Sequence, residues 1–113
     1  MAEQNVCAEE GTVMVSFGII AAAGSARSLA FEALRSAKGQ DFDKAAELLR
    51  QSKQAALEAH HMQTELLSKE AAGEHTPVDV MLIHAQDHLM TSMLAQELIE
   101  ELIVLHKEKA DRA

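Results

Sequence analysis

Residues 80–98 read VMLIHAQDHLMTSMLAQEL, and this stretch decides the fold. Apolar side chains recur in it every three or four residues, which is typical of an amphipathic helix. They form two stripes rather than one: Val80, Ile83, Met90, Leu94 and Leu98 on one side, and Leu82, Leu89, Met93 and Ile103 on another. A helix in a small bundle buries one such stripe within its own chain. The second stripe therefore predicts an interface with another subunit.

Two breaks divide the rest of the chain into helices. Gly39 provides a glycine stop and Asp41 a cap for the next helix, while Gly73 stops the second segment. Thr76 and Pro77 then match an N-cap and a first helical position. We expect an unstructured N-terminus over residues 1–8 and one domain over 9–113, with helices at about 9–38, 41–72 and 77–109.

The composition supports an all-α fold. The chain has 113 residues, of which 48% are hydrophobic, yet it contains three Phe, no Trp or Tyr, and one Pro. Such a composition favours helix over sheet, so we expect an antiparallel three-helix bundle. The helix at 9–38 also has two apolar stripes. Its Gly18 and Gly24 lower helix stability unless a neighbouring helix approaches closely at those points.

Charge and cysteine content limit the functions to consider. The net charge is −8, and residues 74–113 hold eight acids against three bases, a field that repels nucleic acid and anionic lipid. The single cysteine, Cys7, excludes an intrachain disulfide and suits a reducing compartment. The uncharged run 13–26 is shorter than the ~20 residues of a spanning helix. We therefore expect a cytoplasmic protein.

A polar cluster interrupts the apolar helix at His84, Asp87 and His88, which lie on one helical arc with Thr91. No Lys or Arg occurs between Lys69 and Lys107, so Asp87 has no local cation. In one interpretation, the histidines and the aspartate satisfy one another in a helical interface. Alternatively, a neutral imidazole acts as a nucleophile while the other histidine or Thr91 donates hydrogen bonds to a bound anion. In a symmetric oligomer, copies of Asp87 would share a divalent cation such as Mg²⁺.

Other constellations are weaker. Glu58 and His61 have the spacing of half a di-iron site, whose other members are missing, and a solvated face is the better interpretation. Arg27 is suited either to bind an anion or to form an ion pair. A non-enzymatic helical adaptor and a small metal-binding bundle built on His84, Asp87 and His88 remain alternatives at this point.

The string from Val80 to Met93 resembles the signature of the lactose/cellobiose class of enzyme IIA, a subunit of the bacterial phosphoenolpyruvate-dependent sugar phosphotransferase system. The resemblance extends over nearly all of residues 12–107. Further matching segments are Ala26-Arg27-Ser28, Gly39-Gln40-Asp41-Phe42, and Ala59-His60 with Gln63-Thr64. Ser25 departs from the Gln or Asp expected before Ala26, which leaves any role for that position open.

The resemblance implies three-helix subunits that assemble as a trimer, a nine-helix bundle. It implies that His84 carries a phosphoryl group on Nε2, received from the phosphocarrier protein HPr and passed to a cysteine of the IIB subunit. Asp87 matches the aspartate at the trimer axis that binds a metal, Mg²⁺ in the lactose branch, and Gln86 and His88 match supporting positions. The sugar itself binds the membrane component IIC. The motif is more similar to the cellobiose/diacetylchitobiose branch, and a lactose-specific IIA is the alternative.

Overall fold

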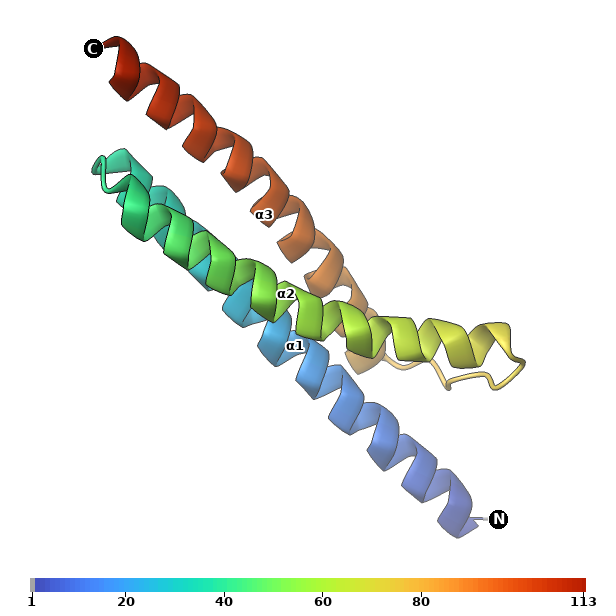
Figure 1. Cartoon of the computed structure of the whole chain (residues 1–113). Helices are drawn as coiled ribbons and strands as arrows, with labels where there is room; N and C mark the ends of the chain where they lie inside the picture. Colours follow the sequence, from blue (N-terminus) through green and yellow to red (C-terminus); the bar gives the residue numbers. More distant parts are fainter. Residues whose placement is uncertain (1) are drawn as a thin grey trace.

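The computed structural model describes residues 11–113 in full, and all statements on side chains and contacts below concern that part of the chain. Three helices follow one another: α1 (Ala2–Lys38), α2 (Phe42–Ala71) and α3 (Val80–Arg112). In Figure 1, α1 and α3 run in the same direction and α2 runs opposite to both. The expected all-α three-helix fold is confirmed. α1 begins at Ala2, earlier than the helix start expected at about residue 9, whereas the side chains of residues 1–10, that of Cys7 among them, lie outside the described part of the chain.

α1 is the central helix of an elongated molecule with a long dimension of 68 Å. It packs along both other helices, whereas α2 and α3 touch over a much shorter stretch and diverge at their far ends (Figure 1). The buried face of α1 consists mainly of alanines, with Ile19 at the level where all three helices meet. Small side chains let the helix axes come close. The core is therefore thin, and it follows α1 from Ser16 to Ala37.

The interior contains one polar tie that joins all three helices. Ser52 of α2 donates a hydrogen bond to the carbonyl of Ala26 in α1, and Gln96 of α3 donates to the Ser52 hydroxyl at 2.8 Å. All three residues are buried. Because a buried hydroxyl costs free energy unless it is paired, this tie favours one vertical register of the three helices.

The turn between α1 and α2 differs from the sequence prediction in one residue. Asp41 caps α2 as expected, accepting a hydrogen bond from the Lys44 amide at 3.2 Å. The left-handed residue, however, is Gln40 with φ of 64°, and not Gly39. The Asp41 amide donates to the carbonyl of Ser36 at 2.9 Å, which closes the end of α1. The chain therefore reverses at Gln40, one residue later than predicted.

The start of the third helix was predicted three residues too early. α3 begins at Val80 with Asp79 as its N-cap, whose carboxylate accepts from the Leu82 amide at 2.8 Å. The amide of Thr76 donates instead to Glu70 of α2 at 3.2 Å, which holds this segment in the connecting loop. Two capping signals stood close together: Asp79 caps α3, while Thr76 is tied to the end of α2. Gly73 adopts φ of 87° and ends α2 as predicted.

By length and mean hydropathy, one helix among the described residues, Gly11–Lys38, is sufficient to cross a membrane. This corrects the sequence-based reasoning, which considered only the shorter uncharged run. The same helix supplies the central core: Ser16, Ala23 and Ala30 are fully buried against its neighbours. Packing against α2 and α3 thus accounts for part of its apolar character, while Met14 and Phe17 remain exposed.

Candidate functional site

The outer stripe, defined as Val80, Ile83, Met90, Leu94 and Leu98, faces away from the other two helices. These side chains are between 55% and 80% exposed. The opposite stripe supplies Leu82 and Leu89 to the core. The sequence prediction that one chain buries only one of the two stripes is confirmed. Few features other than an interface account for so much exposed apolar surface along one helix.

His84 and His88 lie on the flank of the outer stripe that borders α1. Their rings stack, with centroids 5.9 Å apart and planes within 2° of parallel. The His84 side chain is exposed, whereas His88 is half-buried against α1. Their four-residue spacing in one helix produces this stacking directly. His84 is thus accessible to a partner protein, and His88 lies between it and the first helix.

The carboxylate of Asp87 lies within the outer stripe, between Ile83 and Met90. It is exposed and has no hydrogen bond or ion pair with any side chain of residues 11–113. The interpretation that two histidines neutralise this aspartate within one chain is therefore not supported. No group of three or more acidic, histidine or cysteine side chains suited to a metal occurs among the described residues. One subunit alone supplies a single carboxylate here.

Gln86 lies on the opposite flank of α3. His84 and Gln86 are two residues apart, which places them about 200° apart around a helix. Gln86 instead faces α2, where the Gln63 amide donates to its Oε1 atom. Sequence reasoning grouped Gln86 with His84 as neighbours; within one chain they are separated by the width of the helix. Sequence reasoning also did not identify Gln63 as the partner of Gln86. Gln63 lies four residues after the buried Ala59, and this spacing indicates that it is on the side of α2 that faces α3.

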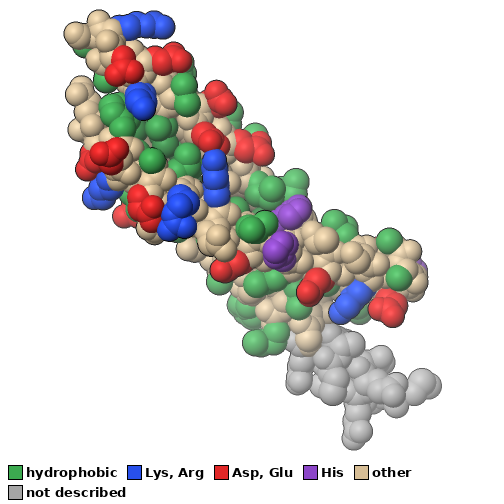
Figure 2. Space-filling view, viewed as in Figure 1, with side chains coloured by type: hydrophobic (Ala, Val, Ile, Leu, Met, Phe, Trp, Pro, Cys, Tyr) green, Lys and Arg blue, Asp and Glu red, His purple; other side chains and the backbone are tan. Residues whose placement is uncertain are grey.

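The remaining candidates take no part in the cluster. Thr91 donates its hydroxyl to backbone carbonyls of its own helix, to Asp87 at 2.9 Å and to His88 at 3.2 Å. Glu58, His60 and His61 are exposed on α2, which confirms that they belong to a solvated face. Figure 2 shows histidine side chains near the middle of that face and charged side chains gathered over its upper-left half.

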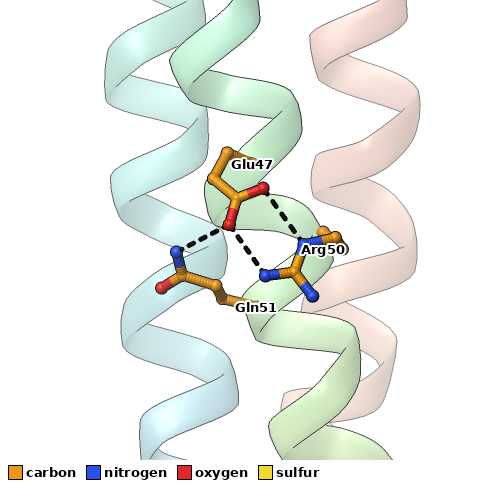
Figure 3. Close-up of polar contacts among 3 residues, drawn as sticks. All are labelled: Glu47, Arg50 and Gln51. Carbon is orange, nitrogen blue, oxygen red and sulfur yellow. Dashed lines mark hydrogen bonds and ion pairs between the residues drawn. The ribbon is translucent and has the colours of Figure 1, made fainter.

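The clear pKa shifts arise on α2, outside the cluster. The pKa of Glu47 is lowered from 4.5 to about 2, first by a hydrogen bond from Arg50 at 2.8 Å and then by one from Gln51 (Figure 3). The pKa of Glu70 is also lowered, by hydrogen bonds from His75 and from the Thr76 amide. The first group stabilises the α2 surface, and the second holds the loop that leads into α3.

Comparison with known proteins agrees with this geometry. The model of the family described as "PTS system, Lactose/Cellobiose specific IIA subunit" matches residues 14–107. The N,N'-diacetylchitobiose-specific EIIA component of Escherichia coli (strain K12) is 51% identical over 94 residues, which cover 83% of this chain and 81% of that protein.

Solved structures are similar over nearly the same range. The cellobiose-specific enzyme IIA from Bacillus anthracis has a TM-score of 0.86 at 45% identity, with 88% of this chain and 92% of that chain covered. The IIA(chitobiose)–HPr complex of the Escherichia coli phosphotransferase system has a TM-score of 0.77 at 47% identity, with 88% and 96% covered.

Proposed function

Since this chain belongs to the lactose/cellobiose-specific IIA family of the sugar phosphotransferase system, we propose that it carries a phosphoryl group on His84. The observation that carries the proposal is the position of His84, exposed on α3 with the His88 ring stacked against it. An exposed imidazole is open to attack an incoming phosphoryl group. The relative solved as a complex with HPr supports HPr as the donor.

The reaction consists of two successive in-line transfers. In the first, the phosphorus–nitrogen bond of the HPr phosphohistidine breaks as phosphorus bonds to Nε2 of His84. In the second, that new bond breaks as phosphorus bonds to the cysteine sulfur of the IIB subunit. A phosphohistidine is already a reactive donor, so this protein mainly positions the groups and stabilises charge. His88 is placed to orient the His84 ring and to donate a hydrogen bond to the phosphoryl oxygens.

The assembly we propose is a trimer in which the α3 helices meet, because the exposed apolar side chains of the outer stripe would then be buried between subunits. In a cyclic assembly, one flank of each subunit meets the opposite flank of its neighbour. The α1-side flank with His84 then faces the α2-side flank of the next subunit, which presents Gln86. Because Gln63 donates to Gln86 Oε1, the Gln86 N–H groups remain donors. The supporting role of Gln86 therefore operates across the interface and not within one chain.

The same arrangement offers a role for Asp87. Three copies of an unpaired carboxylate near one axis repel one another unless a cation lies between them. Oxygen ligands of this kind suit Mg²⁺, and we propose one ion per trimer, held by the Asp87 carboxylates, which would offset most of their charge. Purified trimer should contain the metal, and chelation should lower its thermal stability. A metal-free trimer of unchanged stability would contradict this role.

The sugar is proposed from the relatives, whose names point to a disaccharide of the cellobiose or diacetylchitobiose kind, with lactose as the alternative. IIB is the proposed acceptor, and the membrane component IIC takes up the sugar. We place the protein in the cytoplasm, where IIB is accessible. Transfer to purified IIB proteins of each branch distinguishes the sugars: the cognate IIB should accept the phosphoryl group fastest.

The proposal is tested by phosphorylation. Incubation with phosphoenolpyruvate, enzyme I and HPr should raise the mass of the protein by one acid-labile phosphoryl group. The increase should be absent in His84→Gln and present in His60→Gln, an exposed histidine on α2 that serves as the matched control. An unlabelled wild-type protein would contradict the phosphocarrier function and favour a helical adaptor.

A further inference from the structure

A polar pocket opens beside His88 on the flank that carries His84. Its volume is about 280 Å³, and it is lined by five residues of α1 and one of α3: Gly24, Arg27, Ser28, Phe31, Arg35 and His88. The lining therefore combines two arginines and a serine of α1 with the His88 imidazole of α3. The first 27 residues of α3 contain no Lys or Arg, so α1 supplies the positive charge next to the histidine pair.

Both arginines are free to bind an anion. Neither forms an ion pair with a carboxylate among residues 11–113, in a chain whose net charge is −8. The Arg27 guanidinium lies over the Phe31 ring, with Cζ 5.7 Å from the ring centroid. Such stacking orients a guanidinium while leaving its N–H groups as donors. The alternative reading of Arg27 as an ion-pair partner within the chain is thus not supported.

Gly24 brings this pocket up to the histidine pair. A Cβ atom at Gly24 would lie 3.5 Å from Nε2 of His88, so α1 and the imidazole are in direct contact there. The His88 ring in turn stacks on the ring of His84, with centroids 5.9 Å apart. The pocket and the exposed ring of His84 are consequently separated by a single imidazole.

We propose that Arg27, assisted by Arg35 and Ser28, binds the oxygens of the phosphoryl group as it enters and leaves His84. This inference rests on the proposed phosphocarrier function, and it names α1 as the source of the cations that the acidic third helix lacks. A guanidinium fork matches the geometry of phosphoryl oxygens. Its charge reduces the repulsion between a phosphoryl group and the acidic surface, without forming or breaking a bond itself.

Transfer kinetics provide the first test. Arg27→Gln should slow phosphoryl transfer from phospho-HPr about tenfold or more, as removal of one donor to a developing oxyanion does. Arg27→Lys keeps the charge but loses the forked guanidinium, so its transfer rate should lie between those of wild type and Arg27→Gln. Arg112→Gln removes an exposed arginine at the end of α3 and should transfer at the wild-type rate. Circular dichroism verifies that each variant is folded.

The second test does not depend on phosphoryl transfer. Inorganic phosphate titrated into the unphosphorylated protein should shift the ring NMR signals of His88 saturably, and Arg27→Gln should abolish the shift. If the wild-type protein accepts no phosphoryl group, the phosphocarrier proposal fails, and the phosphate titration alone tests anion binding in the pocket. An Arg27-dependent shift then supports anion binding by Arg27, and the absence of a shift overturns it. If wild type is phosphorylated and Arg27→Gln transfers at the same rate, the inference is overturned whether or not free phosphate binds.

Discussion

At the scale of the residue, Gly24 lies in the interior of helix α1 and next to the ring of His88. Glycine lowers the stability of a helix by about 0.5–1 kcal/mol relative to alanine. Since a Cβ at this position would make only an ordinary contact at 3.5 Å, Gly24→Ala should raise the free energy of unfolding by that amount. Chemical denaturation measures the change.

The larger substitution Gly24→Leu is the contrasting variant. Its side chain would extend from the Cβ contact into the pocket beside the His88 ring and alter the surroundings of that ring. The His88 ring signals should therefore move, while those of His75, in the loop before α3, stay in place. A destabilised Gly24→Ala protein would contradict the contact as described.

Residue types and spacing selected His84, Asp87 and His88 as candidates, and their roles stay predictions. Spacing four residues apart in one helix predicts the ring stack, because the helix itself places those side chains together. The contacts of Gln63 with Gln86, and of Gly24 with His88, join different helices. They depend on the vertical register between helices, which local patterns in one chain do not contain.

At the scale of the element, the turn between α1 and α2 contains a strained residue. Gln40 adopts φ of 64°, a conformation that carries no penalty for glycine. Gln40→Gly should therefore raise stability by about 0.5–1 kcal/mol, less the extra entropy of the unfolded chain. Urea denaturation at neutral pH is the measurement. Gln54→Gly, within α2, should have the opposite sign, and a loss of stability in both variants would show that Gln40 is not strained.

The surface of α2 should contribute to stability in a pH-dependent way. The pKa of Glu47 is about 2 in the folded chain and 4.5 normally, because Arg50 and Gln51 donate to the carboxylate. A lowered carboxyl pKa stabilises the folded state above pH 4.5, and this contribution is lost as the pH falls from 4.5 toward 2. The difference in thermal midpoint between wild type and Glu47→Gln should therefore shrink over that range. An unpaired control, Glu65→Gln, should show no such trend; equal differences at pH 2 and pH 7 would contradict the assignment.

Helix number and order followed from periodicity, whereas the helix ends did not. Asp41 was identified correctly, since a single Asp stood between a glycine and an apolar run. Asp79 was not, because Thr76 and Pro77 offered a competing start. In the structure the Thr76 amide donates a hydrogen bond to Glu70 of the preceding helix. Local capping rules do not include such a contact.

At the scale of the whole molecule, the proposed trimer depends on the outer stripe. Leu94 is 55% exposed in one chain and would be buried at the axis of the assembly. Burial of a leucine is worth about 1.5–3 kcal/mol, and a buried unpaired lysine costs more. Leu94→Lys should therefore yield a helical monomer by sedimentation velocity. Leu57→Lys alters a leucine of similar exposure on α2 and should remain a trimer. A trimeric Leu94→Lys protein would place the interface elsewhere.

The most direct test of the central claim is to locate the phosphoryl group. The protein phosphorylated through HPr should give a single phosphohistidine signal in ³¹P NMR, and ¹⁵N-labelled imidazole resonances should assign it to Nε2 of His84. The same experiment on His88→Asn should still show the signal, with slower formation. Phosphorylation of another histidine, or a signal that persists in His84→Gln, would contradict the role of His84 as the phosphoryl carrier.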